Sequence, residues 1–365
     1  MNEKAVYTRY MFELFKKEEV GQAIGLDIGT SFIKVVQLRR EKDRIILDTY
    51  GEVPLGPYAG MMAGQAVQAG EEKILEAIND LFKEAKVTAR NTVIAIDPSA
   101  TYVSLIKVPK VDDEQLRTMI PIEARKYIPI PLTEVQMDWW HIPTTINIGS
   151  HEDVVNVVLA AVNNEALALY DRLVKKLQLT NVEYEIHGYS LVRSSAPHTH
   201  KMVLYLDIGA QSSTLSLVDQ NVVLDMHVIS HGSQEGTVQL SRALSVPIDT
   251  AEDAKRTFGY KGDFSNPYIK DIMELSSYPL FGEVARLSLS YERKYNQHIE
   301  GIVLTGGGAR VSGVLDVYAK TVHIAGRIAT PFERVVVPEF LSEMIEKVGP
   351  TYSVAIGCAL KKLIS

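Results

Sequence analysis

The sequence predicts a mixed α/β fold made of two related halves, and three observations lead to this prediction. The tetrapeptide Leu-Asp-Ile-Gly occurs twice, beginning at Leu26 and at Leu206, each time between two apolar runs typical of β-strands. A third apolar run, residues 301–305, leads into three consecutive glycines. The chain has 365 residues, of which 46% are hydrophobic and 23% charged, which is the composition of a globular protein with two or more domains.

The remaining elements follow the hydrophobic periodicity along the chain. The first half begins with three strands over 21–52, a loop over 53–70, a helix over 71–85 and a strand over 92–96. The next unit has strands near 101–108, 135–142 and 153–162 and helices near 113–127 and 164–178. The second half begins with strands near 202–207, 212–219 and 222–229, followed by helices near 233–244 and 280–297. Pro121 should kink the first helix of the middle unit or start a turn there, and Ser233 is expected to cap the helix after it.

Two segments outside these elements leave alternatives open. In residues 1–20, Val6, Tyr10 and Leu14 recur at helical spacing, so this extension either docks as a short amphipathic helix or frays. His198 and His200 lack acidic neighbours, which favours a solvated loop over a metal site.

Composition excludes several classes of protein. The formal net charge is -7, from 38 basic and 45 acidic residues, so bulk electrostatics disfavour a nucleic-acid partner. Cys358 is the only cysteine, which excludes an intramolecular disulfide and fits a reducing compartment. Apolar stretches are too short to cross a bilayer, and the N-terminus lacks the pattern of a secretory signal. We therefore expect a cytoplasmic protein that reaches a membrane only through a partner.

The two Leu-Asp-Ile-Gly copies carry the residue types that a phosphate site needs. Gly29 and Gly209 permit a tight turn in which backbone N–H groups and hydroxyls can bind phosphate oxygens. Asp27 and Asp207 repel phosphate but can hold Mg²⁺ through water. An Asp-x-Gly turn alone is common in proteins without such a site. The pair with matching flanks favours two hairpins that clamp a nucleotide phosphate chain across a cleft.

The third motif, Gly306-Gly307-Gly308, lets a flat ring or a phosphate lie against bare backbone. Val311 stands where a dinucleotide-binding G-x-G-x-x-G motif needs its last glycine, and the sequence contains no G-x-x-x-x-G-K-[ST] P-loop. The glycines therefore point to a nucleotide fold other than these two.

These motifs, in this order, resemble the phosphate-1, phosphate-2 and adenosine motifs of the actin-like ATPase superfamily, which includes actin, sugar kinases, FtsA and MreB. Residues 250–259 resemble the helix in which bacterial actins place a Glu and a Lys against the ribose and adenine. Glu252 and Lys255 share one face of that helix, and a solvated ion pair between them is the alternative.

Within the superfamily, the chain is similar to the PilM family of type IV pilus proteins. The resemblance is carried by residues 111–131, which end in Tyr-Ile-Pro-Ile-Pro, and by the tail at 349–360. It departs from the family at Pro121 and at His187-Gly188-Tyr189. The implied fold is the actin-like ATPase fold, in which two ribonuclease-H-like halves enclose a nucleotide and an FtsA/PilM-type subdomain is inserted. The implied division is an extension at 1–20, subdomain 1A at 21–96, 179–200 and 350–365, subdomain 1C at 97–178, subdomain 2A at 201–246 and 299–349, and subdomain 2B at 247–298.

The resemblance also implies ATP and Mg²⁺ as ligands, with Asp27 and Asp207 holding the metal through water and Lys34 reaching back to the phosphates. The hairpin residues expected to line the phosphates are Gly29, Thr30, Ser31, Gly209, Ala210, Gln211 and Thr214. Those expected to hold the nucleoside are Glu252, Lys255, Gly306, Gly307, Gly308 and Arg310. The side chain that orients an attacking water would lie where the chain returns to the first half. Glu183 and Glu185 are the nearest candidates, and a surface role for both is the alternative.

The implied function is an ATP-binding cytoplasmic scaffold of the pilus assembly platform at the inner membrane, with weak ATPase activity at most. Its implied partners are the N-terminal cytoplasmic peptide of PilN, the pilus motor ATPase and other platform proteins, and a homo-oligomer is also open. Two alternatives remain. An FtsA-like division protein would need a membrane-targeting helix, which the residues after Leu360 do not provide. A small-molecule kinase of the sugar-kinase branch would need a base beside its acceptor hydroxyl.

Overall fold

Two β-sheets with the same strand order form the centre of the protein. The computed structural model describes residues 21–143, 145–146, 153–195, 201–263 and 265–364. The first sheet has the order β3-β2-β1-β4-β8 and consists of β1 (Gln22–Ile28), β2 (Phe32–Glu41), β3 (Arg44–Pro54), β4 (Asn91–Ile96) and β8 (Thr180–Ile186). The second half repeats this order as β11-β10-β9-β12-β13, with β9 (Val203–Ile208), β10 (Ser213–Asp219), β11 (Val222–Ile229), β12 (Gly301–Thr305) and β13 (Gly326–Ile328).

The strand directions repeat as well as the order. In each half the first three strands form an antiparallel meander, the fourth strand pairs in parallel with the first, and the fifth pairs in parallel with the fourth. Parallel pairing needs a crossover connection, which the intervening helices provide. The prediction of a mixed α/β fold with two related halves is therefore confirmed.

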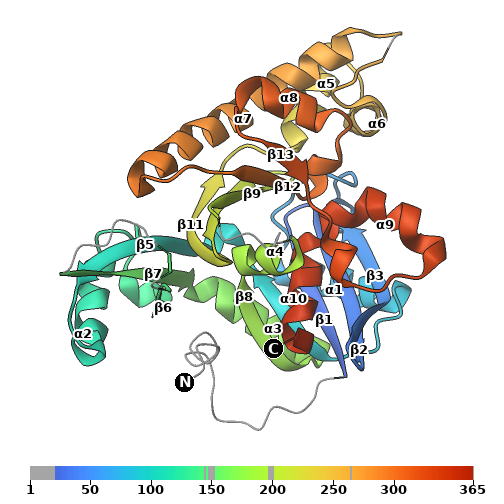
Figure 1. Cartoon of the computed structure of the whole chain (residues 1–365). Helices are drawn as coiled ribbons and strands as arrows, with labels where there is room; N and C mark the ends of the chain where they lie inside the picture. Colours follow the sequence, from blue (N-terminus) through green and yellow to red (C-terminus); the bar gives the residue numbers. More distant parts are fainter. Residues whose placement is uncertain (1–20, 144, 147–152, 196–200, 264, 365) are drawn as a thin grey trace.

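The second sheet continues beyond β11 into the middle unit of the chain. β5 (Thr101–Pro109), β7 (Val154–Asn163) and β6 (Val135–His141) extend it, and the junction is a single register pair, Asp225 with Ser104. α2 (Asp113–Ala124) packs on this extension through Leu116 and Ile120 (Figure 1). The subdomain boundaries that the sequence suggests stay a prediction.

Helices cover both faces of the first sheet. α1 (Glu71–Glu84) and α3 (Asn164–Leu177) bury their apolar faces against one side. α4 (His187–Ser195) and α10 (Ser353–Ile364) lie on the other side, where glycine permits close contact. A Cβ at Gly25 would lie 1.8 Å from the Ala355 carbonyl oxygen, and one at Gly357 would lie 1.9 Å from that of Ser190. α4 carries the chain from the first half into the second, and α10 brings it back, so these two packed helices join the halves.

The helices α5 (Gln234–Leu244), α6 (Ile248–Phe258), α7 (Tyr268–Tyr295) and α8 (Val314–Thr321) lie in the upper part of Figure 1. The helix α9 (Ser342–Val348) lies lower, beside β3, and its Ile345 belongs to the same buried cluster as Val36 of β2. The glycine motif runs into a short 3-10 helix, η5 (Gly307–Arg310). A second one, η8 (Gly349–Tyr352), lies beside it, and its Pro350 carbonyl accepts from the Gly306 N–H. The described part of the chain has no helix long and apolar enough to cross a membrane.

Three local expectations need correction. α2 continues through Pro121 to Ala124, so the turn that was one of the two alternatives at Pro121 does not form. The Ser233 hydroxyl makes no capping hydrogen bond to α5, although Ser233 does occupy the N-cap position. α7 begins at Tyr268 rather than near residue 280, with Pro279 inside it; Pro279 is exposed, so water can reach the carbonyl that lacks its helical partner. The expectations for residues 1–20 and for His198 and His200 lie outside the described residues.

Candidate nucleotide-binding site

Each half forms a hairpin whose turn is closed in the same way. The Gly29 N–H donates to the Phe32 carbonyl, and the Gly209 N–H donates to the Ser212 carbonyl, both at 3.1 Å. At the base of the first hairpin Asp27 pairs with Lys34, and in the second Asp207 pairs with Thr214. The two copies therefore present an aspartate at equivalent positions, two residues before the turn glycine.

The two aspartates belong to one electrostatic site. Lys34 Nζ lies 3.3 Å from Asp27 Oδ2, and both side chains are largely buried. Burial opposes the charge of Lys34, but Asp27 and Asp207 outweigh it and raise the pKa of this lysine. Burial likewise opposes the charge of Asp207, but its neighbours His187 and Lys34 lower its pKa below the usual value. Because Lys34 and Asp207 come from different halves, this mutual effect indicates that the hairpins face each other.

His187, the first residue of α4, is a site residue that the sequence interpretation missed. Its Nε2 lies 2.8 Å from Asp207 Oδ2, and the residue is only 4% exposed. Burial opposes protonation, but the contact with Asp207 outweighs it and raises the pKa of the imidazole. Its Nδ1 is buried and has no hydrogen-bond partner among the described residues. One feature of the sequence could have indicated His187: it lies where the chain leaves the first half, in a segment that departs from the family pattern.

The glycine motif reaches the same aspartate from β12. Thr305 pairs in register with Asp207, so the next residue, Gly306, enters the site with φ 82. A Cβ at Gly306 would lie 2.2 Å from Asp207 Oδ1, and one at Gly308 would lie 2.2 Å from Ile208 Cγ2. Gly307 is exposed, and a Cβ there would meet nothing within 4 Å. The motif thus packs tightly against β9 on one side and leaves bare backbone open at Gly307.

The hairpin turns also contact their surroundings through groups expected to bind phosphate. The Ser31 hydroxyl donates to the Gly64 carbonyl at 2.8 Å, and the Thr30 carbonyl accepts from the Val67 N–H. The Ser31 side chain therefore holds the loop before α1. In the second turn the carbonyls of Gly209 and Ala210 accept from the N–H groups of Ser233 and Gln234, Gln211 is exposed, and Thr214 is buried on β10.

Glu252 and Lys255 form an ion pair on α6 that is buried rather than solvated. Lys255 Nζ lies 2.7 Å from Glu252 Oε2 and 3.3 Å from the Ser233 carbonyl oxygen. Burial lowers the pKa of Lys255; for Glu252 burial acts in the opposite direction, but Lys255 outweighs it and lowers the pKa. Through Ser233 the pair connects to the second hairpin. Arg310, in contrast, is exposed and donates to the Lys347 carbonyl, so it is not brought to the aspartates.

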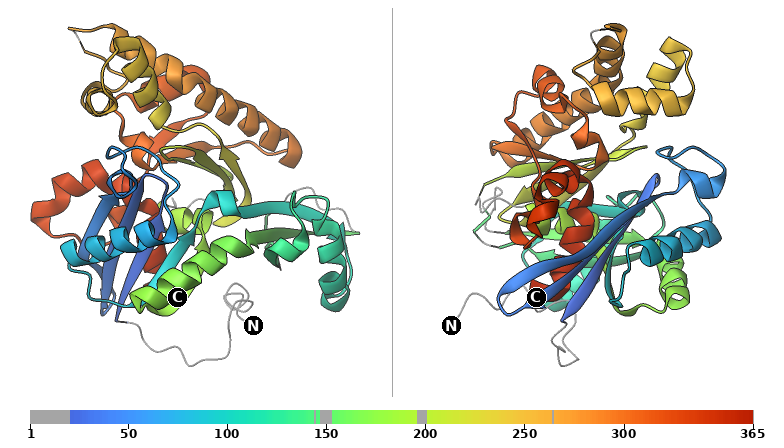
Figure 2. Two further views of the ribbon diagram at one scale, coloured as in Figure 1. Left: turned by 180° about the vertical axis from the view of Figure 1, so that it is seen from behind. Right: turned by 90° about the vertical axis from the view of Figure 1, so that its right-hand side faces the viewer.

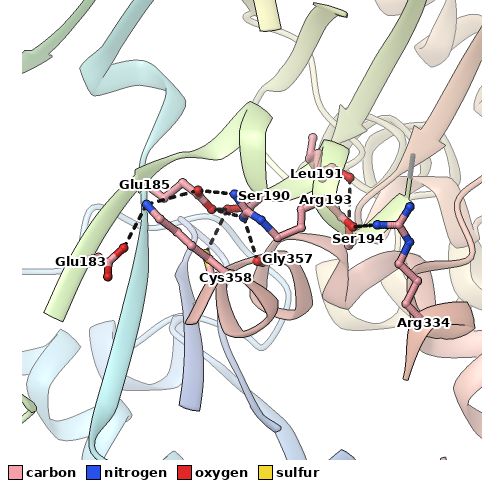
Figure 3. A network of polar contacts seen from close by, with 10 residues as sticks. Glu183, Glu185, Ser190, Leu191, Arg193, Ser194, Arg334, Gly357 and Cys358 are labelled. Carbon is pink, nitrogen blue, oxygen red and sulfur yellow. Dashed lines mark hydrogen bonds and ion pairs between the residues drawn. The ribbon is translucent and has the colours of Figure 1, made fainter. Parts of the chain in front are cut away.

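Glu183 and Glu185, the carboxylates expected to orient a water, have other partners (Figure 3). Glu185 is 6% exposed and accepts two hydrogen bonds from Arg193, at 2.6 and 2.7 Å, and one from Ser190 at 2.6 Å. Glu183 is ion-paired with Lys361 and Lys362 at the end of α10. These contacts favour a structural role for both residues over the candidate catalytic role, because their acceptor positions are already used by the protein.

The donor set fits a magnesium–nucleotide complex. Mg²⁺ is usually bound by one or two carboxylates, with waters and substrate phosphates supplying the other ligands. Asp27 and Asp207 provide two carboxylates, and the described residues contain no group of three or more His, Cys, Asp or Glu side chains that could hold a metal alone. Two hollows in the described surface lie elsewhere, one beside Arg39 and Asp48 and one beside Tyr58 and Glu76. We assign the site from the converging motifs because those hollows include none of them.

Duplicated hairpins that face each other, joined by a glycine motif from the second half, define a protein with the actin-like ATPase fold. MreB 5 of Spiroplasma citri bound to AMPPNP shares this fold, with a TM-score of 0.51 and 12% identity over 93% of this chain and 95% of that chain. A family model described as type IV pilus assembly protein PilM matches residues 25–363. The chain belongs to the PilM family.

Two further comparisons agree with this membership. The structure of a PilM-PilN type IV pilus biogenesis complex is similar, with a TM-score of 0.79 and 26% identity over 95% of this chain and 99% of that chain. The cell division protein FtsA of Neisseria meningitidis serogroup B is 24% identical over 375 residues, which cover 91% of this chain and 88% of FtsA.

Proposed function

We propose that this chain binds Mg-ATP between its two hairpins and acts as a nucleotide-binding scaffold of the type IV pilus assembly platform. The observation that carries the nucleotide site is the convergence of Asp27, Asp207 and Gly306, which come from three separate motifs. Family membership and the similarity to the PilM-PilN complex support a role in pilus assembly, with the N-terminal peptide of a PilN protein as the partner. The AMPPNP bound to MreB 5 supports the choice of an adenine nucleotide.

In this proposal Asp27 and Asp207 hold Mg²⁺ through water, and the metal neutralises phosphate charge when it is bound. Lys34 adds a positive charge beside the phosphates, and the turns at Gly29 and Gly209 offer backbone N–H groups nearby. The bare backbone at Gly307 gives the nucleoside a surface to lie against. His187 donates to Asp207 and keeps that carboxylate ionised and oriented, which makes it a positioning residue.

The scaffold part of the proposal concerns what the nucleotide does. ATP stabilises the arrangement of the two halves, and turnover is weak at most, because the carboxylates near the chain return are held by Arg193 and the α10 lysines. The protein then links PilN to the pilus motor at the cytoplasmic face of the inner membrane. The subdomain division given by the sequence remains part of this proposal.

Calorimetry with purified chain tests the nucleotide site. We expect Mg-ATP binding that weakens at least tenfold in Asp27→Ala and in Asp207→Ala, with Glu183→Ala as the matched carboxylate control that keeps its affinity. Unchanged affinity in both aspartate variants would exclude the two-hairpin site. A separate pull-down with a synthetic PilN N-terminal peptide, with and without ATP, tests the pilus role, and no binding in either state would overturn it.

A further inference from the structure

The long helix α7 carries a second apolar line on its exposed side. Its core side is already filled, because Met273, Phe281, Val284 and Tyr291 are all buried. On the opposite side Tyr268 is 69%, Leu275 65%, Tyr278 42% and Leu289 54% exposed. Figures 1 and 2 show α7 along an outer edge of the second half.

The exposed residues form one straight line rather than scattered positions. Tyr268, Leu275, Gly282 and Leu289 follow each other at heptad spacing, which keeps them on one face of a helix. Single exposed leucines are normal at protein surfaces. A helix that already packs one apolar face on its own core does not need a second one, so a spaced line of exposed apolar residues is available for contact with another molecule.

The line is symmetric about Gly282. Leu275 and Leu289 lie equally far on either side of it, and so do Asp271 and Arg293. The same holds for Tyr278 and Arg286. The charged members of these pairs, Asp271, Arg286 and Arg293, are all exposed.

We propose that α7 is a dimerisation helix, which packs antiparallel against α7 of a second copy with the two-fold axis at Gly282. A two-fold axis places each residue opposite its counterpart across the centre. Leu275 then contacts Leu289 of the second copy, Asp271 meets the opposite charge of Arg293, and Tyr278 lies against the guanidinium of Arg286. A parallel arrangement would instead place Asp271 opposite Asp271 and Arg293 opposite Arg293, which like charges disfavour.

Gly282 fits the centre of such a contact. It is exposed, and a Cβ at this position would meet nothing within 4 Å inside its own chain. Glycine in a helix interior is less favourable than alanine, so the folded chain alone gains nothing from it. At the crossing point of two helices, the missing side chain lets the backbones approach closely.

Sedimentation equilibrium of the full chain over a concentration series tests this interface. We expect a monomer–dimer equilibrium whose dissociation constant rises at least tenfold in Leu275→Asp and in Leu289→Asp. Ile122→Asp, which changes an exposed apolar residue of α2, is the matched control and should leave the constant unchanged. A chain that is monomeric at all concentrations, or a dimer unaffected by both leucine changes, would overturn the proposal.

A charge exchange tests the antiparallel direction. Asp271→Arg and Arg293→Asp should each weaken the dimer, because each places like charges opposite one another. The double variant Asp271→Arg/Arg293→Asp should restore the dimer, since it re-forms both pairs with the signs exchanged. Failure of the double variant to restore association, with its circular dichroism spectrum unchanged, would contradict the antiparallel pairing.

Discussion

Two buried clusters of charged side chains lie on either side of the chain return, and they differ in how fully the protein satisfies them. The two-hairpin cluster consists of Asp27, Lys34, His187 and Asp207. The α4–α10 cluster centres on Glu185 and Arg193. In the two-hairpin cluster one buried nitrogen, His187 Nδ1, has no hydrogen-bond partner among the described residues, and the adjacent glycine motif is open at Gly307.

The α4–α10 cluster leaves little for a ligand to do. Both oxygens of Glu185 accept from Arg193, and Arg193 also donates to the Gly357 carbonyl at 2.9 Å. Lys361 Nζ, from α10, lies 3.4 Å from Glu185 Oε1 and adds a further positive charge to the cluster. Buried polar groups that are fully paired rigidify a structure, whereas an unpaired one keeps its hydrogen-bonding capacity for water, an ion or a ligand. The comparison therefore separates a joint between the halves from the proposed ligand site, although both are built from buried acidic and basic side chains.

The largest expected effect is on the joint. Arg193→Met leaves Glu185 buried without its main partner, which should lower the free energy of unfolding by about 3–5 kcal/mol in urea denaturation. The double variant Arg193→Met/Glu185→Leu should recover most of this loss, because no buried charge remains. The double variant should also bind Mg-ATP with the affinity of the wild type. A single variant as stable as the wild type would remove the distinction between the clusters.

The next effect is on the glycine motif. Gly306→Ala forces a residue with φ 82 to carry a Cβ that would lie 2.2 Å from Asp207 Oδ1. The strained backbone should cost about 1–3 kcal/mol of stability, and Mg-ATP affinity should fall because Asp207 is displaced. Gly307→Ala is the matched control for stability, since a Cβ there meets nothing and should leave the unfolding free energy nearly unchanged. Equal stability losses in the two variants would show that the close approach to Asp207 is not real.

A smaller effect concerns pH and sharpens the role of His187. Burial opposes protonation of His187, but contact with Asp207 outweighs it and raises the pKa of the imidazole above its ordinary value of 6.5. The stability that the charged form contributes is therefore fully present below about pH 6.5 and is lost as the pH rises through the folded value. The free energy of unfolding of the wild type should therefore fall more between about pH 6 and about pH 9 than that of His187→Gln. Lys34, with a raised pKa above 10.5, and Asp207, with a lowered pKa below 3.8, titrate outside this window. Identical pH dependence in both proteins would contradict the pairing.

The smallest effect is expected at the half-exposed edge of the joint. Glu183 has a 40% exposed side chain, so its pairs with Lys361 and Lys362 are screened by solvent. Glu183→Gln should change the free energy of unfolding by less than about 1 kcal/mol. A loss as large as that of Arg193→Met would show that the cluster is centred on Glu183 instead.

Local patterns in the sequence predicted most of the fold. The repeated Leu-Asp-Ile-Gly copies predicted the duplicated sheet order, because alternating apolar runs and turn glycines are local signals. The roles of Glu183 and Glu185 could not be predicted in this way. Their partners are Arg193 on the next helix and two lysines from the last turns of the chain. No local sequence pattern near Glu183 indicates contact with Lys361. His187 was missed for the same reason, since its partner Asp207 comes from the next strand of the other half.

The prediction that α7 begins near residue 280 was wrong for a different physical reason. Proline inside a helix usually signals an end, because it frees a carbonyl and its ring clashes with the preceding turn. Pro279 is on the exposed side of α7, where water can satisfy that carbonyl. Exposure of one position decides whether the proline is tolerated, and exposure follows from packing that the local sequence does not contain.

Hydrogen exchange of the full chain, with and without Mg-ATP, tests the contrast between the two clusters most directly. Binding at the two-hairpin cluster should slow amide exchange in the turns at residues 28–32, 208–212 and 306–310. Exchange around Glu185 and Arg193 should change much less, because that cluster is already closed by the protein. No change in the three turns, or slowing centred on α4 and α10 instead, would contradict the assignment of the open cluster as the nucleotide site.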